Sequence, residues 1–394
     1  MSEPSRDEIF RALEHVIDPE LRRPVTDLDM VRSVEISGGD VVVTIALTIA
    51  GCPLRSSFED QVGQHVGSVL GVERVALRFD VMSPEEKQAL TTKLRGGVTE
   101  RTKGISLDAS TRVLAVCSGK GGVGKSTLTA NLAVAFSRLG QRTGILDADV
   151  YGHSIPHLLG IHQKPVLVDK MIVPPVWFLP ERDRSEMGRP VGSDGRAGKP
   201  ARPENGVASA AFGLKLMSIG FFLDDNQPVM WRGPMLHRAL EQFLSDVHWG
   251  ELDMLVVDMP PGTGDVSISL GQLLPRAEVV VVTTPQRAAQ EVASRAATMA
   301  QKTNMRLVGV IENMSGEVFG TGGGEELALQ LGLPLLGRIP LDPELRVWGD
   351  RGEPLVSAEP ESHSAREIMR IAEELAALKR ERGVGIVKPL TVLS

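Results

Sequence analysis

Residues Val113–Thr127 read VLAVCSGKGGVGKST, and this stretch decides the fold. It opens with an apolar run rich in β-branched side chains, which predicts a buried strand. The run leads into a glycine, four residues and then Gly-Lys-Ser, which is the full P-loop pattern. Apolar residues then recur at helical spacing over residues 128–139, so a helix is predicted directly after the loop. Strand, glycine loop and helix in this order favour a P-loop over a simple Gly-rich turn.

The chemistry of such a loop is anion binding. Glycines let backbone N–H groups converge on phosphate oxygens, and the helix N-terminus adds its positive dipole end. Lys125 places a full charge at the β- and γ-phosphates, and the Ser126 hydroxyl can ligate Mg²⁺. The predicted nucleotide-binding residues of the loop are Gly119, Lys120, Gly121, Gly122, Val123, Gly124, Lys125, Ser126 and Thr127.

Composition narrows the function classes. A chain of 394 residues with 42% apolar residues is long enough for two to three domains with real cores. The net charge of −7 argues against a general nucleic-acid binder, and we expect neither nucleic acid nor membrane as partner. Two cysteines exclude a disulfide scaffold and fit a reducing compartment. No signal peptide and no apolar stretch of ~20 residues is evident, so we expect a cytoplasmic soluble protein.

Residues 1–90 predict a small α/β domain in the order helix, strand, strand, helix, strand. Helical spacing and strict alternation of apolar residues distinguish the two kinds of element. The predicted elements are helices over residues 9–17 and 58–69 and strands over residues 31–36, 41–48 and 75–81. Residues 91–111 are polar and without periodicity, and they predict a linker.

Residues 112–382 predict a second α/β domain, with a mostly parallel sheet flanked by helices. Its expected strands after the P-loop helix cover residues 142–147, 214–219, 252–258, 278–283, 306–312 and 336–342. Residues 175–208 are rich in Pro, Gly and charge and predict a flexible insertion. Residues 365–382 predict an amphipathic helix that packs on the domain rather than on a membrane, and residues 383–394 form a tail.

Acidic residues follow two of these predicted strands. Asp147 ends the strand RTGILD and Asp149 follows two residues later, while Asp258 ends the strand LDMLVVD. Ligands of an open α/β sheet lie at the carboxyl ends of its strands, and an Asp there can hold Mg²⁺ through water. Asn313 ends a further strand, and Pro340 follows in the last one, where it would help to wall the base. No Asn-Lys-x-Asp motif occurs, which favours ATP over GTP.

The string GKGGVGKST carries a second lysine, Lys120, and resembles the deviant Walker A loop of the ParA/MinD/nitrogenase-iron-protein class of ATPases. The resemblance implies that Lys120 reaches across a dimer interface to the partner's nucleotide. It also implies that Asp147 lies near Mg²⁺, that Asp149 orients or deprotonates the attacking water, and that Asn313 meets the adenine ring. Lys120, Lys125 and Asp149 are therefore the expected catalytic residues.

Further strings stand in the order of a narrower family: VIDPEL and LTIAGCPL in the first domain, then DADVYGHSIPHLLG, WRGPMLHRAL, LVVDMPPGTGD and VIENMS. Together they resemble the Mrp/ApbC-type ATPases, which are bacterial iron–sulfur cluster carriers. That family implies ATP binding, slow hydrolysis, a homodimer, a [4Fe–4S] cluster at the dimer interface, and delivery of clusters to apo-proteins.

The chain departs from this family at the cluster. Many members carry a Cys-x-x-Cys pair shortly after VIENMS, whereas this chain reads VIENMSGEVFGTGGGEEL. A cluster normally takes four thiolates, and each subunit offers only Cys52 and Cys117. Family members place a cysteine where Cys52 stands, so Cys52 is the tentative iron–sulfur ligand. Its alternative is a buried small hydrophobe, as expected for Cys117 on the strand that enters the P-loop.

Three function classes remain open on the sequence. The first is an ATP-dependent iron–sulfur cluster carrier. The second is a cluster-free ATPase switch that acts on a protein partner. The third, a ParA-like nucleic-acid module, is disfavoured by the acidic composition.

Overall fold

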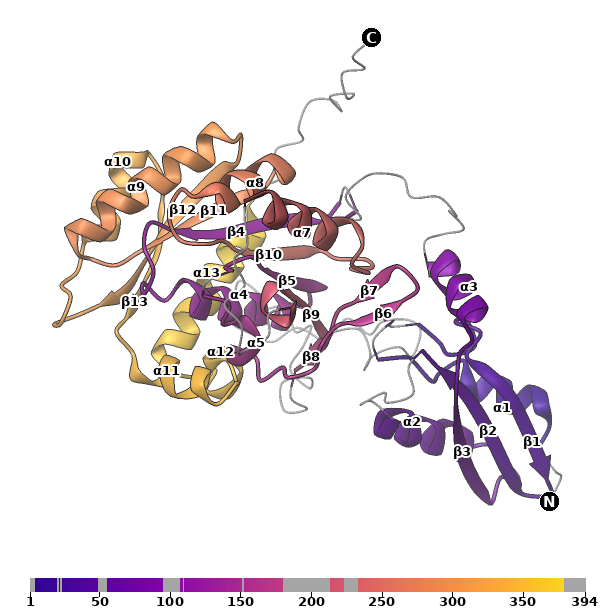
Figure 1. The fold of residues 1–394 in the computed structure, drawn as a ribbon. Coiled ribbons are helices and arrows are strands. Elements are labelled where there is room, and N and C mark those ends of the chain that lie inside the picture. Colours follow the sequence, from indigo (N-terminus) through magenta and orange to yellow (C-terminus); the bar gives the residue numbers. More distant parts are fainter. Residues whose placement is uncertain are drawn as a thin grey trace, which may run out of the picture.

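A computed structural model of the chain describes residues 4–19, 21, 23–48, 55–94, 107–108, 110–150, 152–179, 213–222 and 233–378. These residues form a small N-terminal domain and a larger α/β domain (Figure 1). Cys52 and the predicted tail, residues 383–394, lie outside the described residues.

The small domain has the predicted order of elements, followed by one further helix. Its elements are α1 (Arg6–Leu13), β1 (Val31–Ser37), β2 (Asp40–Leu47), α2 (Arg55–Gly67), β3 (Arg74–Val81) and α3 (Pro84–Leu94). β1 and β2 form an antiparallel hairpin, and β3 lies parallel to β2. Gly38 in the hairpin turn has a φ of +61°, a conformation that glycine adopts without strain. Ser5 and Glu8 form a capping box that begins α1.

The large domain contains the remaining elements. Its first half comprises β4 (Arg112–Ser118), α4 (Lys125–Arg138), β5 (Thr143–Asp147), α5 (Ile155–Leu158), β6 (Val166–Val168), β7 (Met171–Val173), β8 (Val176–Phe178), β9 (Gly213–Ser218) and the 3₁₀ helix η1 (Ile219–Phe222). Its second half comprises α7 (Gly233–Ser245), β10 (Met254–Asp258), α8 (Asp265–Leu273), β11 (Glu278–Thr283), α9 (Arg287–Lys302), β12 (Arg306–Ser315), α10 (Gly323–Leu331), β13 (Leu335–Pro340), α11 (Pro343–Asp350), α12 (Leu355–Ala358) and α13 (His363–Ala377).

The central sheet has the strand order β13-β12-β11-β4-β10-β5-β9-β8. All neighbouring strands are parallel except β8, which pairs antiparallel with β9 at the edge. The register aligns Asp258 of β10 with Asp147 of β5. Because both residues end their strands, the sheet itself brings the two carboxylates together.

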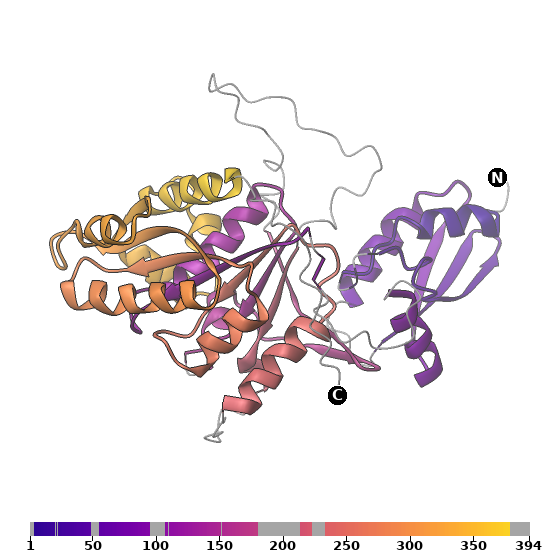
Figure 2. The same cartoon turned by 90° about the horizontal axis from the view of Figure 1, so that it is seen from above.

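Helices cover both faces of this sheet, as Figure 2 shows. One apolar core unites α4, α5, α11, α12 and α13 with one face, and a second core unites α7, α8, α9 and α10 with the other. Strand residues alternate between the cores, so Leu114 and Val116 join the first while Ala115 and Cys117 join the second. The predicted fold class, a mostly parallel α/β sheet with a small α/β domain before it, is confirmed.

The structure corrects two predicted boundaries. Helix α3 extends to Leu94, and its Thr91 is buried, so the first residues of the predicted linker belong to the small domain. The predicted insertion begins too early, because Val176–Phe178 form the edge strand β8. Three apolar residues suffice there, since β9 supplies the backbone partners that a short strand lacks alone.

The sequence pattern did not predict the β6–β7 hairpin, whose strands are three residues each. None of the helices in the described ranges combines the length and apolar character that crossing a bilayer requires.

Candidate functional site

The P-loop joins β4 to α4 in a conformation that depends on its glycines. Gly122 and Gly124 have φ values of +78° and +79°, a region that favours glycine. A Cβ on Gly119 would lie 2.2 Å from the backbone nitrogen of Ala293 in α9. The loop therefore lies directly against the backbone of a neighbouring helix, and its first glycine is needed for that close approach.

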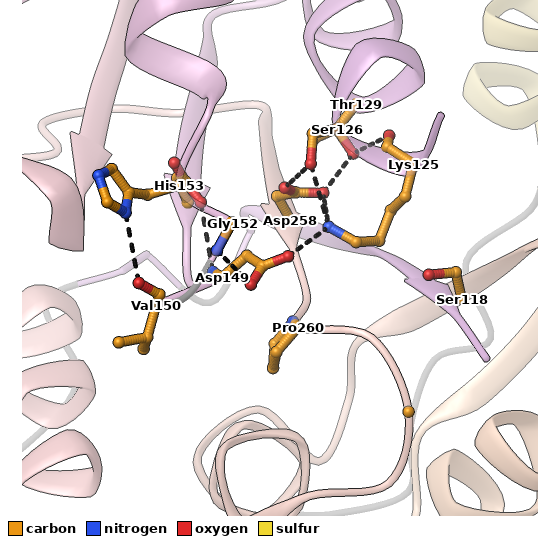
Figure 3. A network of polar contacts seen from close by, with 12 residues as sticks. Ser118, Lys125, Ser126, Thr129, Asp149, Val150, Gly152, His153, Asp258 and Pro260 are labelled. Atoms are coloured by element: carbon orange, nitrogen blue, oxygen red, sulfur yellow. Dashed lines mark hydrogen bonds and ion pairs between the residues drawn. The ribbon is translucent and has the colours of Figure 1, made fainter. Parts of the chain in front are cut away.

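Lys125 lies at the centre of a buried polar network (Figure 3). Its ammonium nitrogen lies 2.7 Å from Asp258 Oδ1, 3.4 Å from Asp149 Oδ2 and 3.2 Å from the Ser126 hydroxyl. The hydroxyls of Ser126 and Thr129 donate to the two oxygens of Asp258, at 2.6 and 2.8 Å. The lysine predicted to bind phosphate and the aspartate predicted to hold Mg²⁺ are thus direct neighbours.

Asp147 lies beside Asp258 and is fully buried. Ser218, at the end of β9, donates a hydrogen bond of 2.9 Å to Asp147 Oδ2. Burial, reinforced by the charge of Asp258, raises the pKa of Asp147 well above its usual range, although Ser218 and Lys125 oppose the shift. The Asp147 carboxyl is therefore the one most ready to hold a proton at this site.

Asp149 follows two residues later and turns back toward the same lysine. Its backbone nitrogen donates to Asp147 Oδ1 at 3.2 Å, and its own Oδ1 accepts from the Gly152 nitrogen at 3.1 Å. Its other oxygen faces the Lys125 ammonium at 3.4 Å.

The donor set fits a magnesium ion. Asp149 and Asp258 place two carboxylates against the single ammonium of Lys125, with Asp147 buried at the end of the strand beside that of Asp258, and a divalent cation would offset their negative charge. Within the described ranges, no three His, Cys, Asp or Glu side chains are arranged to enclose a metal. Mg²⁺ at phosphate sites needs no such cage, because one or two carboxylates, a hydroxyl, phosphate and water complete its shell. Ser126 and Asp258, at 2.6 Å from each other, would hold it.

Asn313 lies near the end of β12, and Pro340 ends the neighbouring strand β13. The amide nitrogen of Asn313 donates to the Val123 carbonyl of the P-loop at 2.8 Å, and its buried oxygen has no hydrogen-bond partner among the residues that the structure describes. Pro340 pairs with Ser315, two residues after Asn313. A buried acceptor without a donor fits the exocyclic amino group of adenine, since such an atom is costly to leave unpaired.

Lys120 and the loop after β10 complete the surroundings of the P-loop. Lys120 is exposed, and its carbonyl oxygen accepts from the Ser118 hydroxyl at 3.0 Å. The Gly262 nitrogen donates to the Ser118 carbonyl at 2.8 Å, so the segment between β10 and α8 is hydrogen-bonded to the strand that enters the P-loop. Among the described residues, Lys120 takes no part in the Lys125 network, and its side chain is exposed.

Cys117 is 2% exposed, and burial raises the pKa of its thiol to about 12. The turn after β12 is closed by a bridge between Gly316 and Gly320. The buried Glu312 carboxylate accepts hydrogen bonds from the Gly322 and Gly324 nitrogens, at 3.1 and 2.5 Å. Both glycines lie at the N-terminal end of α10.

Sequence reasoning missed three polar residues of this region: Thr129, Ser218 and Glu312. Thr129 lies one helical turn after Lys125, and Ser218 ends a strand beside Asp147, so their spacing and strand-end positions were available as signals. Glu312 also ends a predicted strand, but its partners on the far side of the turn, the Gly322 and Gly324 nitrogens, come near it only in the folded protein.

The chain matches two known protein families and several curated relatives. Residues 109–181 and 192–376 match the family described as NUBPL iron-transfer P-loop NTPase, and residues 6–77 match the family described as iron-sulfur cluster assembly protein. Proteins named iron-sulfur cluster carrier protein from Mycobacterium leprae and Bacillus subtilis are 46% and 38% identical. Each comparison covers 94% of this chain, with 93% and 97% of the relative.

Among solved structures, a nucleotide-binding protein from Archaeoglobus fulgidus in complex with ADP is 33% identical over 64% of this chain and 89% of its own, with a TM-score of 0.48. The fold assignment rests on the sheet order and the P-loop described above rather than on this overlap.

Proposed function

The chain belongs to the family of NUBPL-type iron-transfer P-loop NTPases, and from that premise we propose that it is an ATP-hydrolysing iron–sulfur cluster carrier. In this proposal a homodimer hydrolyses ATP slowly with Mg²⁺ and delivers a cluster to apo-proteins. The observation that carries it is the buried network in which Lys125 lies 2.7 Å from Asp258 and 3.4 Å from Asp149. The cysteine content supports a cytoplasmic location, since thiols stay reduced there.

The residues divide the work of ATP hydrolysis. When ATP binds, phosphate oxygens replace the carboxylates of Asp258 and Asp149 as the ionic partners of the Lys125 ammonium. Ser126 and Asp258 hold Mg²⁺, which supplies charge neutralisation at the phosphates when bound. Asp149, freed from Lys125, orients the attacking water. Lys120 of the other copy in a dimer reaches the same nucleotide.

Base recognition would fall to Asn313 and Pro340. The unpartnered Asn313 oxygen can accept a hydrogen bond from the amino group of adenine, whereas guanine presents a carbonyl oxygen at the equivalent position. This contact favours ATP over GTP. The cost of leaving a buried acceptor unpaired makes the discrimination larger than one exposed hydrogen bond would give.

The cluster is the cargo in this proposal, and Cys52 is its protein ligand. The thiolate is the form that binds metal, and a buried thiol with a pKa of about 12 does not supply it, which leaves Cys117 out. A dimer then offers two thiolates, whereas a [4Fe–4S] cluster normally takes four. We therefore expect the bound iron to be substoichiometric and easily removed by a chelator, with an external thiol completing the ligands of the cluster.

The test is anaerobic reconstitution followed by iron and sulfide analysis. We expect iron in the wild type and in Cys117→Ser, and loss of iron in Cys52→Ser. Stable iron in Cys52→Ser would remove Cys52 as the ligand. Absence of iron from the wild type would instead favour the second candidate, a cluster-free ATPase switch on a protein partner. The Gly316–Gly320 turn, which has no cysteine, is the observation that keeps this candidate open.

A further inference from the structure

The β6–β7 hairpin of the large domain packs into the core of the small domain. Val168, Met171 and Val173 are 1–2% exposed and share one apolar cluster with small-domain residues, including Leu90 of α3. The Thr91 hydroxyl of α3 lies 3.3 Å from the Val168 carbonyl oxygen. The hairpin is therefore a docking surface on which the small domain sits, with α3 in contact with β6 (Figure 1).

Helix α3 is bound firmly to the rest of the small domain. Lys93 forms an ion pair of 2.6 Å with Asp29, and Glu86 accepts from the Arg32 guanidinium at 2.8 Å. Leu90 of α3 is buried in the same core as β2 and α2. A shift of the hairpin against α3 would consequently be felt by the whole small domain.

The other side of the hairpin is fixed to the end of α7. The Ile172 nitrogen donates to the Asp246 carbonyl at 2.9 Å, and the His248 nitrogen donates to the Ile172 carbonyl at 2.7 Å. Ile172 forms a parallel bridge with Val247, and Trp249 follows as a fully buried anchor. Because backbone bonds make this connection, the hairpin and the segment after α7 move together.

Helix α7 in turn leads back to the P-loop. It packs on α8, with Leu240 and Leu270 in one core cluster. The Ser267 hydroxyl of α8 is fully buried, 3.4 Å from the Gly262 carbonyl, and Gly262 donates to the carbonyl of Ser118 at the start of the P-loop. A continuous series of contacts therefore joins the segment between β10 and α8, beside Lys125 and Asp258, to the β6–β7 hairpin on which the small domain packs.

We propose that the β6–β7 hairpin couples nucleotide binding at the P-loop to docking of the small domain. The proposal rests on the nucleotide binding proposed above and adds a second partner surface to it. Occupation of the P-loop shifts the segment after β10, α8 and α7 carry the shift, and the hairpin transmits it to α3. Coupling of this kind is reciprocal, so release of the small domain must change nucleotide affinity by the factor by which nucleotide changes docking.

The hairpin offers a matched pair of variants. Val168→Asp places a charge in the buried contact with α3, whereas Leu167→Asp places the same charge on the neighbouring residue, which is 63% exposed. Met171→Ala is a milder second variant, because it removes contact area at the same interface without adding a charge. Thermal melts of all three show whether the large domain remains folded.

The experiment measures two quantities: hydrogen exchange of α3 and β7, with and without Mg²⁺–ATPγS, and the Kd of ATPγS. We expect nucleotide to change α3 exchange in the wild type and in Leu167→Asp. In Val168→Asp we expect fast α3 exchange in both states and a Kd changed by about five-fold or more, with a smaller change of the same sign in Met171→Ala. Unchanged α3 exchange in Val168→Asp would overturn the docking surface. A released α3 with a wild-type Kd would overturn the coupling, while no ATPγS binding by the wild type would overturn the proposed function and the coupling with it.

Discussion

Lys125 holds together carboxylates that would otherwise repel one another. Its side chain is 6% exposed and contacts Asp258 and Asp149 in a site with little water to screen their charges. The same ammonium that neutralises these carboxylates is the one that phosphate must capture. Nucleotide binding is therefore an exchange of ionic partners, and its strength depends on this one side chain.

Lys125→Ala should weaken ATP binding at least about a hundred-fold, which corresponds to about 2.7 kcal/mol. Titration with a fluorescent ATP analogue measures the loss, and circular dichroism checks that the fold is intact. Asp149→Asn, which keeps the side-chain shape, should leave binding nearly unchanged and strongly reduce turnover. Hydrolysis near the wild-type rate in a folded Lys125→Ala protein would contradict the assignment of the P-loop.

Asp147 predicts a pH-dependent stability. Its raised pKa means that the folded protein keeps a proton which the unfolded chain releases, so stability falls as pH rises from about 4 toward the folded pKa. Relative to the wild type, Asp147→Asn, which mimics the protonated form, should gain stability as pH rises from about 4, by up to about 1.4 kcal/mol per pH unit until the folded pKa is passed. Melts without Mg²⁺ or nucleotide measure this difference.

The control is Asp60→Asn, which makes the same substitution on an exposed face of α2, away from the buried site. A constant difference between wild type and Asp147→Asn across the pH range would contradict a raised pKa for Asp147.

At the scale of elements, the P-loop depends on the helix packed against it. A Cβ on Gly119 would meet the backbone of α9, whereas a Cβ on Gly121 would meet nothing within 4 Å. Gly119→Ala should therefore destabilise the protein by about 1–3 kcal/mol, as overpacking does, and weaken nucleotide binding. Gly121→Ala should leave the free energy of unfolding unchanged, because the added Cβ meets no neighbouring atom. Denaturant unfolding and nucleotide titration of the two variants check this, and equal behaviour would contradict the close packing of loop and helix.

The elements that could be predicted were those with a long pattern or a known motif. The sequence predicted β11 at its full extent and the strands that end in Asp147 and Asp258 to within about two residues, because apolar runs define strands in a parallel sheet. It did not predict β6, β7 or β8, since three residues show no periodicity and gain their partners only in the fold. In the network around Lys125, the sequence predicted Ser126, Asp149 and Asp258 but not Thr129. It did not predict the pairings either, because these depend on the register of β5 and β10.

At the scale of the molecule, the small domain and the β6–β7 hairpin share an apolar core cluster that the sequence of neither part predicts. Val168 and Met171 look like ordinary strand residues until the fold places them against α3. The same limit applies to Lys120, whose expected target lies on another chain. The pattern of one chain indicates that Lys120 is important, whereas the group that it contacts would lie on the second copy in a dimer.

Lys120 belongs to this scale because its expected partner is a second copy of the chain. The side chain is exposed beside a P-loop whose other lysine is fully engaged with Asp258. If Lys120 acts across a dimer, Lys120→Ala should bind ATP with near-wild-type affinity but hydrolyse it at least about ten-fold more slowly, since a transition-state contact is lost while ground-state binding remains.

Mixing the two defective proteins tests the same idea without a structure of the dimer. In a heterodimer of Lys120→Ala and Asp149→Asn, one site lacks both groups, while the other has an intact Asp149 and receives an intact Lys120 from its partner. Mixing should restore up to about half of the activity per mixed dimer, because one of its two sites is complete. Mass spectrometry confirms that mixed dimers form. If they form and no activity returns, Lys120 acts within its own subunit, and the exposed side chain needs another explanation.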